Sequence, residues 1–317
     1  MRTTSRAAAL ALVCTTMWAI SAVAQDYPTR QINMAIPFPP GGNTDLMARA
    51  LQPELAKALG QSVIALNKGG AGGTIGNIEV SSSRPDGYTI GLTPNNPLTA
   101  QPHVQKLPYG MDSFKYVCLT YYVPYVVMAS PKAPFKTFQE FVAFTKAKSD
   151  NLIYASPGPG TQPHLGILSA LGSIKGEGVH VPFTGAGPMS QAMLSGTVMA
   201  MSESTAVAKA SNLVVLAAQT KERIASLPDV PTMAELGYAS EAFSAGGLIV
   251  PAATPDAVVA RLQKACGDAV ASECYKAATE KLNAVARFLP SAEFRKMFDE
   301  DSTRNAGAVK AAGLAPK

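Results

Sequence analysis

Short runs of apolar residues alternate along this chain with longer segments in which apolar residues recur every three or four positions. Residues 32–36 form a run typical of a buried strand, and residues 45–59 show helical spacing that ends at Gly60. The strand-like pattern returns at residues 63–66, 88–92, 152–155, 179–183 and 213–217. Strands that alternate with helices indicate an α/β fold with parallel sheets covered by helices on both faces.

Three loops rich in glycine and proline follow predicted strands and precede predicted helices. They are PFPPGGNTD at residues 37–45, SPGPGTQPH at residues 156–164 and FTGAGP at residues 183–188. Ligands of parallel α/β sheets bind beyond the carboxyl ends of the strands, where such loops lie. The first two loops are the most alike, and we interpret them as two halves of one binding site.

The composition of these loops favours a negatively charged ligand. Glycine lets the backbone approach a ligand closely, and the first amides of a helix have no partner within the helix. Together with the helix dipole, these amides bind anions without arginine or lysine. Asp45 places an acid at the start of the first helix, where it either caps the helix or meets an amine or hydroxyl group of the ligand.

The first 24 residues have the pattern of a secretory signal peptide. A basic start precedes an apolar run at residues 7–20, and the sequence AVA at residues 22–24 matches a cleavage site. The run is shorter than the roughly 20 residues of a membrane-spanning helix. We therefore expect cleavage after Ala24 and a periplasmic protein.

Charge and motif content argue against several other classes of protein. Charged residues make up 15% of the chain and the formal net charge is +5, with no basic run that would follow nucleic acid phosphates. There are three histidines, and no pair of histidines or cysteines has metal-ligand spacing. The stretch GGAGGTIG at residues 69–76 departs from a dinucleotide loop, since Ile75 replaces its third glycine. We expect no cofactor, no metal and no nucleic acid partner, and we interpret the acidic run at residues 299–301 as a solvated helix face.

Three cysteines lie beyond the predicted signal peptide: Cys118, Cys266 and Cys274. In an oxidising compartment, Cys266 and Cys274 are the plausible disulfide pair. Eight residues of continuous helix would separate their Cα atoms by about 12 Å, so this pairing requires a break near Ser272. Cys118 stands in an apolar, strand-like run and is expected to be a buried thiol.

The chain resembles the extracytoplasmic solute receptors of tripartite tricarboxylate transporters, the Bug receptors. The resemblance rests on segments in family order, among them YPTRQINMAIPFPPGGNTDLMARAL, LPYGMDSF, LIYASPGPGTQPHL, HVPFTGAGPM, SLPDVPTMAELGY and GLIVPAATPDAVVARL. It implies a periplasmic-binding-protein fold of the type II kind, in which two doubly wound sheets are joined by two hinge strands with a ligand cleft between them. The implied domains are residues 25–125 and 246–317 for the first and 126–245 for the second.

The resemblance also implies a function and a site. The protein would bind a small organic carboxylate through backbone amides, close over it, and deliver it to membrane permease subunits, acting as a monomer without enzymatic activity. From the loops and the family pattern together, the expected ligand-binding residues are Phe38, Gly41, Gly42, Asn43, Thr44, Asp45, Asn96, Gly160, Thr161, Gln162, His164, Thr184 and Glu203. The chain departs from the family at Met199 and in the pair Ser202-Glu203, so the ligand of a relative should not be transferred.

Two alternatives share parts of this pattern. A ligand-sensing subunit would have the same cleft but pass its closed form to a signalling partner instead of a permease. An exported hydrolase would use His164 with a nearby serine or aspartate, and it would lose turnover in His164→Ala. A receptor predicts no turnover at all.

Overall fold

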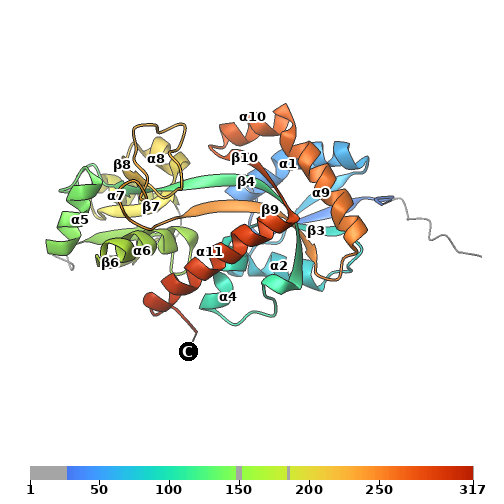
Figure 1. Cartoon of the computed structure of the whole chain (residues 1–317), viewed down its shortest axis with the longest axis horizontal. Coiled ribbons are helices and arrows are strands. Elements are labelled where there is room, and N and C mark those ends of the chain that lie inside the picture. Colours follow the sequence, from blue (N-terminus) through green and yellow to red (C-terminus); the bar gives the residue numbers. More distant parts are fainter. Residues whose placement is uncertain (1–26, 148–151, 184–185, 317) are drawn as a thin grey trace, which may run out of the picture.

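The computed structural model describes residues 27–147, 152–183 and 186–316. The predicted signal peptide, its cleavage site and Thr184 lie outside the described residues. Within them, strands and helices alternate as the hydrophobic pattern predicts, and the helices cover both faces of a curved sheet (Figure 1).

The first lobe is built on six strands with the order β2-β1-β3-β9-β4-β10. Strands β1 and β2 are parallel, as are β1 and β3, whereas β9 is antiparallel to its neighbours β3 and β4. The bounds of these strands are β1 (Ile32–Ile36), β2 (Val63–Asn67), β3 (Thr89–Pro94), β4 (Phe114–Ala129), β9 (Phe243–Pro251) and β10 (Val285–Pro290).

The second lobe uses the far end of β4 together with four other strands. Strand β5 lies between β6 and β7 and is parallel to both, and β4 is antiparallel to both β7 and β8. Their bounds are β5 (Ile153–Ser156), β6 (Val179–Pro182), β7 (Ala200–Ser204) and β8 (Val214–Ala218).

Strand β4 passes from one lobe to the other, and β9 lies beside it across the middle of the molecule (Figure 1). Up to Pro124, β4 pairs with β9; from Tyr125 onward it pairs with β7 and β8. The chain returns to the first lobe at Ala242, whose carbonyl accepts a hydrogen bond from the Tyr125 amide at 3.2 Å. Two adjacent crossings of this kind allow a hinge motion between lobes.

Each lobe has helices on both sheet faces, and apolar side chains fill the space between sheet and helices. In the first lobe, α1, α9 and α10 pack on one face and α2, α3 and α11 on the other. In the second lobe, α5 and α6 pack on one face and α7 and α8 on the other. The helices are α1 (Asn43–Leu59), α2 (Thr74–Ser82), α3 (Asn96–Thr99), α4 (Gln101–Val104), α5 (Phe138–Ala147), α6 (Gln162–Ile174), α7 (Ala186–Ser195), α8 (Thr205–Ser211), α9 (Asp256–Ala271), α10 (Glu273–Lys281) and α11 (Ser291–Ala311).

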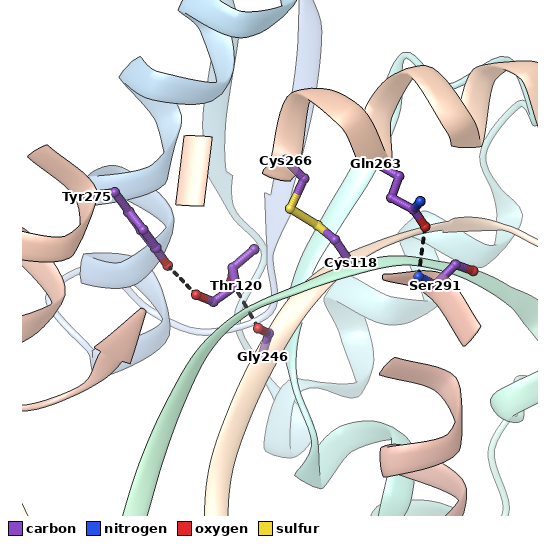
Figure 2. The surroundings of a disulfide bond; sticks show 7 residues. All are labelled: Cys118, Thr120, Gly246, Gln263, Cys266, Tyr275 and Ser291. Atoms are coloured by element: carbon purple, nitrogen blue, oxygen red, sulfur yellow. Dashed lines mark hydrogen bonds between the residues drawn. A yellow bond between two sulfur atoms is a disulfide. The ribbon is translucent and has the colours of Figure 1, made fainter. Parts of the chain in front are cut away.

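The prediction of a Cys266–Cys274 disulfide was wrong. Cys266 is bonded to Cys118 on β4, with Cα atoms 6.6 Å apart (Figure 2). Cys274 is exposed and has no disulfide partner among the described residues. The helix does break at Ser272, but α10 restarts with Cys274 turned to the surface. Residues 148 positions apart meet because α9 packs on the sheet beside β4, which is a contact that local sequence spacing does not contain.

The acidic run on α11 is also only partly solvated. Asp301 is 2% exposed, and its Oδ2 accepts hydrogen bonds from Thr99 Oγ1 at 2.7 Å and Asn95 Nδ2 at 2.9 Å. Asn305, one turn further along α11, donates to the same carboxylate at 3.2 Å. These bonds fix α11 to the loop that begins α3.

Candidate ligand-binding site

The first loop is held in shape by its own aspartate. The Gly41 amide donates to Asp45 Oδ2 at 2.9 Å, and Gly41 has a φ of +82°, which favours glycine. Asn67, at the end of β2, donates to Asp45 Oδ1 at 2.8 Å and to the Phe38 carbonyl at 3.0 Å. Asp45 is therefore occupied within the protein and does not present its carboxylate to a ligand.

The ionisation of Asp45 agrees with this role. Burial acts to raise the pKa of Asp45, but hydrogen bonds from Arg49, the Gly41 amide and Asn67 outweigh burial and lower that pKa. Arg49 also forms an ion pair with Asp45 at 2.9 Å. The carboxylate thus stays charged and holds the turn that leads into α1.

The second loop is built in the same way as the first. The Gly160 amide donates to Nδ1 of His164, four residues later, at 3.1 Å, and Gly160 has a φ of +71°. The residue that follows each glycine is the N-cap of a helix with extended backbone: φ and ψ are −76° and 163° at Gly42, and −72° and 157° at Thr161. Each lobe therefore presents the same backbone arrangement: a glycine with positive φ, an N-cap residue with extended backbone, and the start of a helix.

In both loops the glycine amide is used internally, and in the second loop the Thr161 amide also donates to the Gly158 carbonyl at 3.4 Å. Among the described residues, no protein acceptor is recorded for the main-chain N–H groups of Asn43 and Thr44, nor for those of Gln162 and His164. Such first-turn amides, backed by the helix dipole, attract anions. The arrangement can hold a carboxylate at each helix start.

The two lobes are in contact beside these loops. Asn96 Nδ2, at the start of α3, donates to the Gly160 carbonyl at 3.0 Å. A Cβ placed on Gly160 would lie 3.0 Å from Val104 on α4, so the second loop packs closely against the first lobe. Asn96 is the predicted site residue that directly joins the lobes.

The glycine-rich stretch at residues 69–76 supports the first loop, a role that the sequence did not reveal. A Cβ on Gly73 would lie 3.0 Å from the Phe38 ring and 2.7 Å from Pro97. A Cβ on Gly69 would lie 2.9 Å from the Pro39 nitrogen. Glycines in this stretch thus let the β2–α2 connection pack directly against the first loop. This packing accounts for the many glycines, and a nucleotide-binding role is not needed to explain them.

His164 is neutral and part of an aromatic stack. Its ring centroid lies 4.1 Å from that of His180, which stacks in turn on Tyr154, and Nε2 of His180 contacts Ser156 Oγ at 2.7 Å. Burial, together with His180, lowers the pKa of His164 to about 4. Protonation of Nδ1 would also turn it into a donor that faces the Gly160 N–H, so the hydrogen bond between them would be lost. Nδ1 of His164 is thus occupied by the Gly160 amide and holds the second loop in shape.

We expect the stability of the ligand-free protein to depend on His164 between about pH 6.5 and pH 4. The folded pKa lies below the unfolded value, so the stabilisation is complete above pH 6.5 and is lost as the pH falls toward 4, by on the order of 3 kcal/mol. His164→Asn keeps an acceptor for Gly160 without a titrating group and should flatten this slope in urea unfolding. His103→Asn, on α4, serves as the control, and an unchanged slope in His164→Asn would refute the assignment.

Two buried polar groups near the helix starts have no partner among the described residues. They are the Tyr121 hydroxyl on β4, which is fully buried beside Thr44 and Ser244 without a hydrogen bond of normal geometry, and Gln162 Oε1. Glu203, at the carboxyl end of β7, is 8% exposed. Tyr121 was not predicted from the sequence, because an aromatic residue within an apolar run has the pattern of a core residue.

Other features of the described residues do not compete with this site. They contain no group of histidine, cysteine or acidic residues able to hold a metal ion. A largely apolar groove of about 970 Å³ lies between α6 and the end of α11, lined by Leu168, Leu171 and Ala308 among others. Its lining includes Tyr154, which stacks beside His164, but none of the residues 37–45 or 156–164 of the two loops. No helix in the described part of the chain has the length and apolar character needed to cross a membrane.

Comparison with known proteins places this arrangement in a family. The family profile described as "Tripartite tricarboxylate transporter family receptor" (TctC) matches residues 47–314. Protein BugT of Bordetella pertussis is 32% identical over 303 residues, which cover 92% of this chain and 91% of BugT. Two solved structures are similar. A TctC solute-binding protein from Polaromonas has a TM-score of 0.81 and 28% identity, covering 90% of this chain and 99% of that one.

The second structure is MatC from Rhodopseudomonas palustris with bound malate, which has a TM-score of 0.74 and 29% identity and covers 89% of this chain and 100% of MatC. These matches confirm the fold that the sequence motifs implied, a periplasmic-binding-protein fold of two α/β domains. On the extent of the family match and the identity to BugT, the chain belongs to the tripartite tricarboxylate transporter receptor family.

Proposed function

We propose that this receptor captures a small organic carboxylate between its two lobes in the periplasm and delivers it to the membrane permease of a tripartite tricarboxylate transporter. The observation that carries the proposal is the pair of identically built helix starts at Gly42 and Thr161, one on each lobe. MatC, which is similar over its whole length, binds malate, a dicarboxylate, and this supports the ligand class.

Capture would combine two electrostatic effects. Each helix start offers free amides and the positive end of a helix dipole, so one acid that reaches both is held from both lobes. The ligand then stabilises the closed form because only that form brings the two starts together. The lobes would move about the crossings near Pro124 and Ala242, as a monomer and without turnover of the ligand.

Binding of a carboxylate should raise the melting temperature of the mature protein. A ligand at one hundred times its Kd adds about 2.7 kcal/mol of stability, which corresponds to a shift of several degrees in a chain of this size. The experiment is a thermal-shift screen against monocarboxylates, dicarboxylates, tricarboxylates and aromatic acids, with the corresponding amides as uncharged controls. A shift with acids alone supports the proposal. A flat response to the whole panel, with no small molecule released on denaturation, would contradict it.

A further inference from the structure

Glu203 is a buried carboxylate at the edge of the sheet where the second loop begins. Strand β7, which ends at Ser204, is parallel to β5, which ends at Ser156 immediately before that loop. The carboxyl ends of parallel neighbours lie at one edge of a sheet, so Glu203 and the second loop share this edge. The side chain is 8% exposed, and one oxygen accepts the Ser204 amide at 2.7 Å.

Glu203 lies beside the crossing between the lobes. On β4, Val126 pairs with Glu203 and Tyr125 pairs with Ser204. Tyr125 directly follows Pro124, the last residue of β4 that pairs with β9 of the first lobe. Glu203 is therefore placed where the second lobe meets the first, at the sheet edge that also carries the second loop.

The surroundings of Glu203 contrast with those of Asp45. Asp45 is 2% exposed, and its carboxylate accepts hydrogen bonds from the Arg49 guanidinium, the Asn67 side chain and the Gly41 amide. For Glu203, the described residues supply the Ser204 amide but no ion pair with lysine or arginine. Burial raises the pKa of Glu203, and the Ser204 hydrogen bonds only oppose that effect. An ionised carboxylate that is buried without a cation is costly unless a ligand supplies the missing charge.

We infer that Glu203 is the acceptor for an ammonium group of the ligand, so that this receptor selects an amino acid over carboxylates that lack an amine. The inference rests on the proposed function: the helix starts hold the carboxylate end, and Glu203 receives the cationic end.

The test compares acids that differ at one substituent. Titration calorimetry would measure succinate, malate and aspartate, and then glutarate, 2-hydroxyglutarate and glutamate, against the native protein and Glu203→Gln. We expect the amino acid of one series to bind at least about 30-fold more tightly than the unsubstituted acid of the same length. Glu203→Gln should remove this preference, so that the amino acid and the unsubstituted acid of the same length bind with affinities within about threefold of each other. Glu177→Gln, an exposed change on the same lobe, is the matched control and should keep the preference.

The outcomes separate this inference from the proposed function. Equal or tighter binding of succinate or glutarate, or a preference that survives Glu203→Gln, would overturn the role of Glu203 and leave a carboxylate receptor intact. Tighter binding of the unsubstituted acids at low pH would mean that protonated Glu203 donates to a carboxylate, which also overturns it. Binding of none of the six acids, in a protein that another carboxylate stabilises, would overturn the inference alone. If no carboxylate stabilises the protein, both the role of Glu203 and the proposed function are overturned.

Discussion

Gly42→Pro and Thr161→Pro should each weaken carboxylate binding by at least about 100-fold, about 2.7 kcal/mol, while the protein still folds. Each change removes one main-chain N–H at a helix start and covers the neighbouring amides with a ring. Thr161→Pro also removes two bonds to the Gly158 carbonyl, from the Thr161 amide at 3.4 Å and from its hydroxyl at 2.7 Å, so its folding is checked by urea unfolding. The backbone φ values of −76° and −72° already suit proline. The chain itself uses proline as the N-cap of α9 (Pro255) and of α11 (Pro290).

Gly160→Pro would be a poor substitute for this test. Gly160 has a φ of +71° and its amide is bonded to His164, so proline there would distort the loop as well as remove a donor. Gly42→Ala and Thr161→Ser are the matched controls, because both keep the amide. A Cβ on Gly42 would meet only the Pro39 carbonyl, at 3.6 Å. Calorimetric titration gives the affinities, and native affinity in both proline variants would refute a site made of the two helix starts.

Loss of the Cys118–Cys266 disulfide should destabilise the protein by on the order of 4 kcal/mol. The bond closes a loop of 148 residues, and the entropy that such a closure removes from the unfolded chain grows with loop length. Both cysteines are fully buried among the side chains that join α1 and α9 to the sheet. Near them, Thr120 donates to the Gly246 carbonyl and Tyr275 to the Thr120 carbonyl, so β4, β9 and α10 are fixed together at this point (Figure 2).

The measurement is urea unfolding of the Cys118→Ala/Cys266→Ala double variant beside the native protein. Cys274→Ser is the control, and its free energy of unfolding should change little because Cys274 is exposed and unbonded. Peptide mapping without reductant identifies the pair directly. Recovery of a Cys266–Cys274 peptide, or equal stability of the double variant, would contradict the structure.

Removal of the disulfide should affect stability more than recognition. The bond lies in the first lobe between β4 and α9, whereas the helix starts lie at Gly42 and Thr161. Proline at either start should do the reverse and reduce affinity without a comparable loss of stability. The two experiments therefore test the framework and the site separately.

The local pattern of this sequence was sufficient for six of the strands, β1, β2, β3, β5, β6 and β8, and for the positions of the two loops. Apolar spacing also predicted α1, which begins at Asn43, within two residues of the expected start. The loops could be recognised because a glycine turn before a helix is set by backbone conformation over a few residues. For the same reason the likeness of the two loops was readable before any fold was known.

Only the tertiary structure decided which distant groups meet. Cys266 bonds to Cys118 rather than Cys274, Asp45 turns to Arg49 and Asn67 rather than to a ligand, and Asp301 is buried against Thr99. Each outcome depends on contacts across strands or lobes, which residue spacing does not encode. Glu203 shows the same limit: no strand was predicted at residues 200–204, and its burial without a cation from the described residues follows from the packing of β7 against β4. Local backbone preferences fixed the helix starts, and long-range packing decided which charges near them are neutralised.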